Sequence, residues 1–320
     1  MQRIGDAVFS LTAINSIIKY HKQKIIIFCY SSSSDVFRFT FPGIELIELT
    51  SDDFYFNKKF AKSKVREIVK KLHPDRIYDL CGSITTASIL LTLPTKELIG
   101  VSQQYFKSIY SHYTPLQQKP HISQIYTDAI KDIVPIEDFK ISHFAGKEPG
   151  FFLVHPFAGW KAKEWGLNKF LQLTCLLNKY SKCYLLIPGN SLTNDTLEEI
   201  KNKNIDFIVT RNTHELIEVI KECSFFIGND SGPVQIANLL GKPSFTIYGP
   251  TNPDMHKPLK GENRYIIKKL VCSPKEEEKW CQTYGGMINC PSFECMNLLE
   301  FDEVENAVIE YLNELKLITK

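Results

Sequence analysis

The chain has no long hydrophobic run. Although 43% of its 320 residues are hydrophobic, no apolar stretch approaches the roughly 20 residues that a helix needs to cross a bilayer. No signal peptide is recognisable either, because no apolar stretch with a small-residue cleavage site follows the first residues, Met1 to Asp6. These absences argue against an integral membrane protein and an exported one, and they predict a cytoplasmic protein.

Neither sign of charge dominates the composition. The 38 Lys and Arg residues against 36 Asp and Glu residues leave a net charge of +2, and we expect no nucleic acid partner. Basic residues are concentrated between residues 58 and 76, where apolar residues recur at roughly helical spacing. Two interpretations stay open: a solvated helix face, or an amphipathic helix near phosphorylated lipid that makes the protein peripheral on the inner membrane.

The length of the chain exceeds what one core usually supports, so two domains are expected. Short apolar runs alternate with helical stretches throughout, a pattern typical of α/β domains whose parallel sheets carry helices on both faces. We place the boundary at 146/147, in a polar stretch that ends at residues 145–149. Strands are predicted at 24–29, 46–49, 77–80, 97–101, 150–155, 184–187, 206–209, 225–227 and 244–248.

The most informative segment is 228–243, in which a polar glycine turn lies between an apolar strand and a small-residue helix. Pro233 suits the first turn of that helix, where its missing amide hydrogen costs little. The free amides and the positive dipole end of the helix favour a phosphate or diphosphate. A second strand then ends in another turn, which completes one half of a nucleotide-binding α/β layer.

The turn Asp230-Ser231-Gly232, followed later by Gly249-Pro250-Thr251-Asn252-Pro253, resembles the donor site of glycosyltransferase family 9, the ADP-heptose:lipopolysaccharide heptosyltransferases. The resemblance runs through most of the chain, from Gly5 to Met296. It implies the GT-B fold, with two doubly wound Rossmann-like domains facing across a cleft. The N-terminal domain, 1–146, would bind the acceptor, and the C-terminal domain, 147–320, the nucleotide-sugar donor.

Near the N-terminus, Gly5-Asp6 reads as a glycine turn followed at once by a helix, with Asp6 at the helix start, where a carboxylate is stabilised as an anion. A plain helix cap is one interpretation. The resemblance implies another, in which Asp6 is the general base that deprotonates the acceptor hydroxyl. Only four residues precede Gly5, fewer than a first strand usually needs. That strand is therefore very short, or the true start lies upstream.

The segment His155 to Trp165 is a predicted loop that leaves the first strand of the second domain. By resemblance, Lys163 approaches the donor phosphates and neutralises the departing diphosphate, a role that Mg²⁺ fills in other sugar transferases. Lys161 could substitute for it. Ala158 and Gly159 would let backbone amides come close to the same phosphates. We expect Trp165 to pack a helix against the sheet.

Three further features complete the predicted donor site. Gly189 with Asn190, and the segment 211–214 with Thr213, end strands at the same edge, where open α/β sheets bind ligands. By resemblance these loops surround the adenosine. At position 235 the family usually has histidine, whereas this chain has Gln235. Glutamine can hydrogen-bond a phosphate oxygen but carries no charge.

The nine cysteines fall into two sets. Five lie in or beside apolar segments and read as buried free thiols: Cys29, Cys81, Cys175, Cys183 and Cys223. The other four are clustered in a polar segment: Cys272, Cys281, Cys290 and Cys295. They fit a structural zinc or iron site, a reduced thiol cluster or disulfides, and no CxxC pair decides between them.

These features together predict a metal-independent, inverting glycosyltransferase that moves heptose from ADP-L-glycero-β-D-manno-heptose to the lipopolysaccharide inner core. No cofactor is required for catalysis, since the ADP-sugar is a substrate. Two alternatives stay open. One is a protein heptosyltransferase of the autotransporter type, which the cysteine cluster favours. The other is a non-catalytic nucleotide-sugar binder on the same fold, which Gln235 favours.

Overall fold

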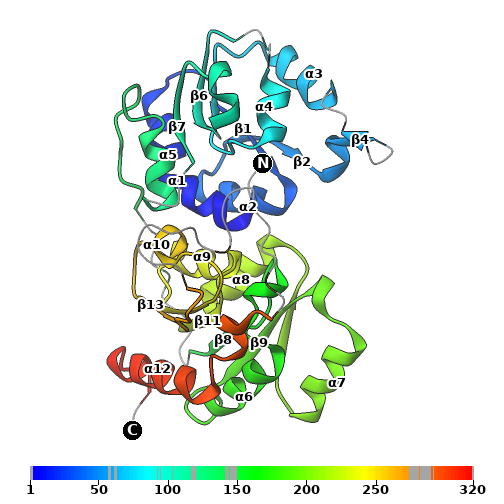
Figure 1. The fold of residues 1–320 in the computed structure, drawn as a ribbon, viewed down its shortest axis with the longest axis vertical. Coiled ribbons are helices and arrows are strands. Elements are labelled where there is room, and N and C mark those ends of the chain that lie inside the picture. The colour runs from blue at the N-terminus through cyan, green and yellow to red at the C-terminus, as the bar shows by residue number, and fades with distance from the viewer. Residues whose placement is uncertain are drawn as a thin grey trace. The chain divides into compact units, whose positions relative to one another are not determined.

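The structure is a computed structural model, and it describes residues 3–56, 59–60, 63–91, 93, 95–102, 104–116, 120–140, 144, 150–273, 281, 290 and 292–318. The chain divides into two compact units, unit 1 (Met1–Lys140) and unit 2 (Ile141–Lys320). Figure 1 shows helices and strands in both of them. The stretch 145–149, where we expected the domain boundary, lies outside the described residues.

Unit 2 is built on a six-stranded sheet with the order β10-β9-β8-β11-β12-β13, and all of its strand pairs are parallel. The chain starts in the middle at β8, runs outward through β9 and β10, then returns to the other side of β8 with β11. This order is that of a doubly wound sheet. The strands are β8 (Phe152–His155), β9 (Cys183–Pro188), β10 (Phe207–Thr210), β11 (Phe225–Asn229), β12 (Ser244–Tyr248) and β13 (Asn263–Ile267).

Helices cover this sheet because its central strands are rich in apolar residues; β8, β11 and β12 are buried at every position. Helices α6 and α12 bury their apolar faces in one core with these strands, while α8 contacts β10 and α9 contacts β11 and β12. The helices are α6 (Leu167–Leu177), α7 (Asn194–Asn202), α8 (Thr213–Glu222), α9 (Gly232–Leu239), α10 (Pro253–His256), α11 (Glu294–Asn297) and α12 (Phe301–Glu314).

In its described residues, unit 1 contains a two-stranded parallel sheet, β1-β2, a three-stranded parallel sheet, β5-β6-β7, and a short antiparallel hairpin, β3-β4. The strands are β1 (Ile26–Tyr30), β2 (Glu45–Leu49), β3 (Tyr55–Phe56), β4 (Lys59–Phe60), β5 (Arg76–Asp79), β6 (Glu97–Ser102) and β7 (His112–Pro115). The helices are α1 (Ile4–Tyr20), α2 (Ser31–Thr40), α3 (Ser63–Leu72), α4 (Ile84–Leu90) and α5 (Ile122–Asp128).

Every strand predicted from the sequence is present, within a few residues of its expected ends. Three features were not predicted: the β3-β4 hairpin, β7 and β13. Both β7 and β13 lie at the outer edge of a sheet and are partly exposed, so they lack the apolar run by which buried strands are recognised.

The N-terminal turn was predicted wrongly. Helix α1 already begins at Ile4, with Arg3 as its N-cap, so Gly5 lies inside the helix. A glycine in the first turn weakens a helix less than one in its middle, because the first amides have no intrahelical partner in any case. Asp6 does lie in the first turn, as expected, where the helix dipole favours a carboxylate.

The basic stretch after residue 58 forms helix α3 in part; Lys58 and Lys62 lie outside the described residues. Val65 and Val69 of α3 are buried in the core of unit 1. Two of its charges are paired, Lys64 with Asp53 and Lys70 with Glu67. The apolar face of α3 is therefore used for folding, which favours the interpretation of a solvated basic face.

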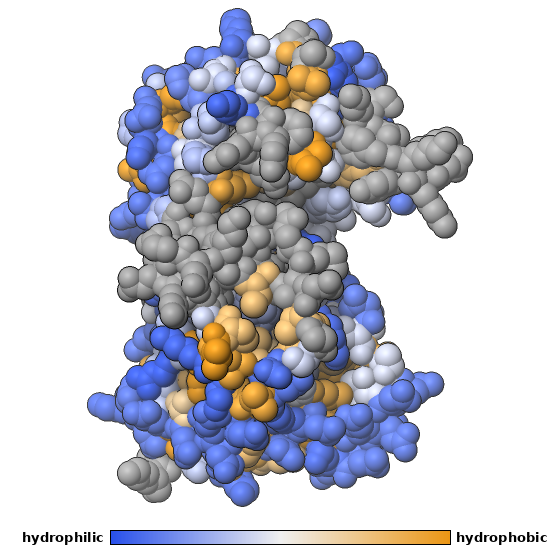
Figure 2. Space-filling model, viewed as in Figure 1, coloured by the Kyte–Doolittle hydropathy of each residue, from blue (hydrophilic) through white to orange (hydrophobic). Residues whose placement is uncertain are grey.

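The surface is mainly hydrophilic in the view of Figure 2, with apolar residues in smaller patches. Among the helices that the structure describes, none is both long and apolar enough to span a bilayer.

Candidate functional site

The order of strands in unit 2 marks a site at the carboxyl ends of β8 and β11. The chain leaves β8 toward one side of the sheet and leaves β11 toward the other, so the two following loops part at this point. In open α/β sheets, ligands bind in the crevice at such a switch point. Here the two loops are residues 156–166, after β8, and residues 230–231, which lead into α9.

An ion pair joins these two loops. The Nζ atom of Lys163 lies 2.7 Å from Oδ2 of Asp230, and the side chains are 19% and 7% exposed. The hydroxyl of Thr251, in the loop after β12, donates a hydrogen bond of 2.7 Å to the same oxygen. The structure thus brings together Lys163 and Asp230, which were predicted as site residues, and adds Thr251 from the second motif.

Asp230 is ionised in this setting. Burial raises the pKa of its carboxyl, but the charges of Lys163 and His256 and the hydrogen bonds from Lys163 and Thr251 outweigh that effect, so the pKa lies below its ordinary value. The carboxylate of Asp230 holds the ammonium group of Lys163 in place through this ion pair. A lysine placed in this way presents a positive charge where an anionic group could approach.

The N-terminus of α9 supplies the second feature of an anion site. Ser231 is the N-cap, yet its side chain makes no capping hydrogen bond, and its buried Oγ has no partner among the described residues. Pro233 stands in the first turn, as predicted. The first amides of any helix have no intrahelical acceptor, and the dipole places partial positive charge there. This end of α9 can therefore accept a phosphate oxygen.

Asn229 holds the two loops in register, and sequence reasoning gave it no role. Its buried side chain accepts a hydrogen bond from the backbone N–H of Trp165 (3.1 Å) and donates one to the carbonyl of Pro156 (2.7 Å). One carboxamide thus clamps both ends of the segment that carries Lys163. The one signal in the sequence for this role is the position of Asn229 at the end of an apolar strand.

Trp165 has the packing role that was predicted. It is 2% exposed, its indole N–H donates to the carbonyl of Leu299 (2.8 Å), and its ring stacks on Phe301. These contacts join the site loop to Leu299, just before α12, and to the first residue of α12.

Two of the other site residues predicted in the first loop contact Glu164. The backbone N–H of Ala158 donates to Oε1 of Glu164 (3.1 Å), and Lys161 pairs with Oε2 of the same residue at 2.7 Å. Lys161 is 84% exposed, so it is less enclosed than Lys163. Gly159 is exposed, and a Cβ atom placed there would meet no atom within 4 Å.

The remaining donor-site predictions fall on the same edge of the sheet. Gly189 and Asn190 are exposed just after β9, and Thr213 begins α8 just after β10. Gln235 is 2% exposed, and its amide nitrogen donates to the carbonyl of His256 at 2.9 Å. In this structure Gln235 therefore fastens α10 to α9.

His155, the last residue of β8, is a buried histidine beneath the site. Burial lowers its pKa to about 4, and neither ring nitrogen has a hydrogen-bond partner among the described residues. Its ring is neutral near pH 7 and packs beside Phe157 and Phe226. It supports the loop that follows rather than carrying a charge.

The cysteine predictions are only partly confirmed. Cys29, Cys183 and Cys223 are buried as predicted, whereas Cys81 is only half-buried and Cys175 is exposed because it lies on the outer face of α6. Cys272 and Cys281 are exposed, and Cys290 and Cys295 are half-buried. The prediction of a zinc or iron site on these last four is not supported, because no group of three or more potential ligands is arranged to hold a metal within the part of the chain that the structure describes.

Asp6 lies in unit 1, in the first turn of α1, and is half-buried. Its predicted role concerns an acceptor rather than the donor site described above.

Comparisons with known proteins identify the family and the fold. The model of the family described as "Glycosyltransferase family 9 (heptosyltransferase)" matches residues 63–284. Lipooligosaccharide heptosyltransferase 2 of Campylobacter jejuni is 24% identical over 287 residues, which cover 85% of this chain and 87% of that protein.

Two solved structures from E. coli have a similar fold. ADP-heptose lps heptosyltransferase II has a TM-score of 0.72 at 15% identity and covers 99% of this chain and 98% of its own. A heptosyltransferase solved with ADP-2-deoxy-2-fluoro heptose has a TM-score of 0.69 at 13% identity, with 97% of each chain covered. The α/β fold of this chain is thus that of the GT-B heptosyltransferases.

Proposed function

The chain belongs to glycosyltransferase family 9, the heptosyltransferases, and from this premise we propose that it moves heptose from ADP-L-glycero-β-D-manno-heptose to a sugar of the lipopolysaccharide inner core. The observation that carries the proposal is the Lys163–Asp230–Thr251 cluster beside the uncapped start of α9. The names of the similar proteins, a lipooligosaccharide heptosyltransferase and an enzyme solved with an ADP-heptose analogue, support the choice of donor and acceptor.

In the proposed reaction, an acceptor hydroxyl attacks C1 of the heptose as the bond between C1 and the diphosphate oxygen breaks. The configuration at C1 inverts. Asp6 takes the proton of the hydroxyl, and ADP leaves with the electron pair of the broken bond. Unit 1, which carries Asp6, would bind the acceptor, and unit 2 the donor.

The donor site stabilises the charge that develops on the departing diphosphate. Lys163 supplies a fixed positive charge, and the amides at Ser231 and Gly232 supply hydrogen bonds and the helix dipole. Because Asp230 holds Lys163 in place before the donor arrives, little reorganisation is needed during the reaction. We propose that no divalent ion takes part.

The other residues predicted to contact the donor have lesser roles in this proposal. The exposed backbone at Gly159 leaves room for a phosphate, and Lys161 and the N–H of Ala158 become available if Glu164 turns away. The loops at Gly189, Asn190 and Thr213 would receive the nucleoside, and Gln235 would position α10 rather than clamp a phosphate.

A transfer assay with Asp6→Asn tests the assignment of the base. The purified protein, ADP-heptose and an inner-core acceptor are incubated, and release of ADP is followed. Asp6→Asn should lower kcat by about 10²- to 10⁴-fold, the usual contribution of a general base. Asp52→Asn, which alters an exposed carboxylate of the same unit, is the control and should stay close to wild type. Near-normal turnover by Asp6→Asn would remove Asp6 from the mechanism.

The same assay decides between the proposal and its alternatives. Heptose added to a protein acceptor but not to the core oligosaccharide, seen by intact-mass measurement, would indicate a protein heptosyltransferase. ADP binding by calorimetry with no turnover of any ADP-sugar would indicate a non-catalytic binder. We further propose that the protein works in the cytoplasm at the inner surface of the inner membrane, where the acceptor lipid is found.

A further inference from the structure

The side chain of Glu164 holds two groups of the loop after β8 that were predicted to contact the donor phosphates. Its Oε1 accepts a hydrogen bond from the backbone N–H of Ala158 (3.1 Å), and its Oε2 lies 2.7 Å from Nζ of Lys161. A phosphate group would use the same N–H and the same ammonium group, because it too is an anion with several acceptor oxygens. The carboxylate of Glu164 therefore makes the contacts that a bound phosphate would make.

Glu164 is drawn into the loop rather than extended into solvent. Its side chain is 12% exposed, although glutamate side chains are mostly exposed in folded proteins. Its two neighbours in sequence are held, Lys163 by the ion pair with Asp230 and Trp165 by the hydrogen bond from its backbone N–H to Asn229. The backbone of Glu164 is thus fixed on both sides, and the position of its carboxylate depends on rotation of its own side chain.

The two ion pairs of the site differ in how firmly they are held. Asp230 and Lys163 are both enclosed, and Thr251 also donates to that carboxylate. Lys161, in contrast, is 84% exposed, and exposed ion pairs contribute little to stability. An incoming anion would therefore displace Glu164 from Lys161 more readily than it would displace Asp230 from Lys163.

We propose that Glu164 is a positioning residue of the donor site that competes with the diphosphate. Before the donor binds, its carboxylate occupies the phosphate contacts of Ala158 and Lys161. It turns away as the diphosphate takes these contacts, and it returns as ADP leaves. This inference rests on the proposed function, because it takes the diphosphate of an ADP-sugar as the ligand. Part of the binding free energy of the diphosphate is used to break the contacts of Glu164, so the protein binds ADP less tightly and releases it faster after transfer.

Calorimetric titration of ADP into the wild type and Glu164→Gln tests this competition. Glutamine keeps the size of the side chain and one acceptor oxygen but has no charge. We expect the Kd for ADP to fall about tenfold in Glu164→Gln, because no carboxylate competes for Lys161. In the transfer assay the KM for the donor should fall as well, while kcat should not rise. A merely structural role predicts the opposite change, since a loosened loop binds ADP more weakly.

Two further variants separate this competition from other effects. Glu218→Gln also removes a glutamate that pairs with a lysine three residues away, Lys221 of α8, and it should keep the wild-type Kd. In a Lys161→Ala background, Glu164→Gln should gain much less affinity, because the cation for which the carboxylate competes is gone. An undiminished gain in that background would contradict the proposal.

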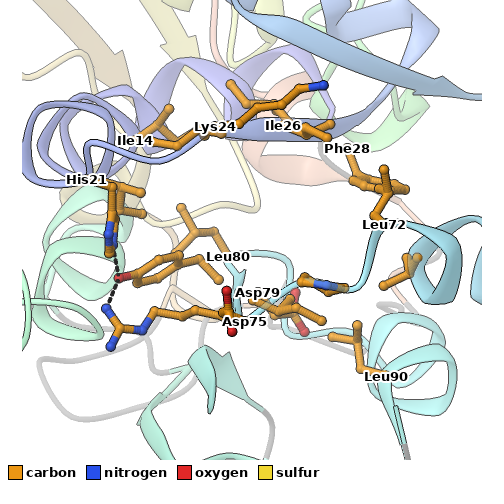
Figure 3. Close-up of a pocket in the computed structure, with 18 of the residues that line it drawn as sticks. Ile14, His21, Lys24, Ile26, Phe28, Leu72, Asp75, Asp79, Leu80 and Leu90 are labelled. Atoms are coloured by element: carbon orange, nitrogen blue, oxygen red, sulfur yellow. Dashed lines mark hydrogen bonds between the residues drawn. The ribbon is translucent and has the colours of Figure 1, made fainter. Parts of the chain in front are cut away.

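The ADP that is measured must bind at the loop and not in another cavity. Figure 3 shows a cavity of about 1380 Å³ in unit 1, with Ile26 and Phe28 on one side and Asp75 on the other. Lys163 belongs to unit 2, so Lys163→Ala should weaken ADP binding at the loop and should leave binding in that cavity unchanged. ADP binding that is unaffected by Lys163→Ala would overturn both this inference and the proposed donor site.

The two proposals fail in different ways. If ADP binds Glu164→Gln as tightly as the wild type, or more weakly, the competition is overturned and the proposed function stands. If ADP binds neither protein, both are overturned.

Discussion

Lys163 and Asp230 form a 2.7 Å ion pair across the two loops of the doubly wound sheet, and Thr251 donates to the same carboxylate oxygen. Lys163 belongs to the loop after β8 and Asp230 to the turn before α9, so the ion pair links these two loops. Because the carboxylate already holds the ammonium group in place, the lysine loses little conformational freedom when an anionic substrate binds.

Replacing Lys163 by alanine should lower kcat by about 10²- to 10³-fold, the usual cost of removing one group that stabilises charge in a transition state. Lys161→Ala is the matched control, because Lys161 belongs to the same loop but is 84% exposed. Initial rates of ADP release give both values. An equal loss in the two variants would mean that the enclosed lysine has no special role.

The free energy of unfolding should decrease as the pH falls, and part of that decrease should come from His155. Burial lowers its folded pKa to about 4, below the value of 6.5 expected in the unfolded chain. The unfolded chain therefore binds the extra proton between these pH values, so stability is complete above pH 6.5 and falls as the pH drops toward 4. The loss attributable to this group is about 3 kcal/mol.

Urea unfolding of the wild type and His155→Leu between pH 4 and 7 checks this expectation. The stability of the wild type relative to His155→Leu should fall as the pH falls, because only the wild type has the histidine. His214→Gln, at an exposed position, should keep the wild-type profile. A pH-independent difference between wild type and His155→Leu would contradict the assignment.

Two glycines near the site should respond to alanine in opposite ways. At Gly228 a Cβ atom would come within 2.9 Å of the carbonyl oxygen of His155 on the neighbouring strand, so Gly228→Ala should destabilise the protein by about 1–3 kcal/mol. Gly159→Ala meets no protein atom within 4 Å and should leave Tm unchanged. If Gly159 gives the donor phosphates room, its variant will raise the KM for the donor instead. Unchanged KM in Gly159→Ala would show that no ligand approaches there.

Removal of divalent ions should leave turnover unaffected. Lysine and helix dipole meet the diphosphate charge in the proposed reaction, so dialysis against EDTA should keep kcat close to its untreated value. Loss of activity that added Mg²⁺ restores would show that a metal takes part.

The sequence was most informative where the physical signal is local. The strand Ser244–Tyr248 was predicted with its observed limits, because a buried apolar run bounded by glycine and proline turns has few other conformations. The turn before α9 was equally clear, since Pro233 and the small residues around it restrict the backbone.

The missed features depend on contacts between distant residues. No local pattern tells that Asn229 bonds both Pro156 and Trp165, because both partners lie more than 60 residues away in the chain. The same holds for Gln235, whose partner is a backbone carbonyl of α10. Edge strand β13 was missed because half-exposed residues do not form an apolar run. Such interactions appear only when the elements have been assembled.

The position of Trp165 gives the protein a built-in optical probe. Its backbone is tied to Asn229 and its indole to Leu299, so any rearrangement of the lysine-bearing loop must disturb the surroundings of the ring. Its fluorescence emission should therefore shift as nucleotide binds, and a titration could be read without a label.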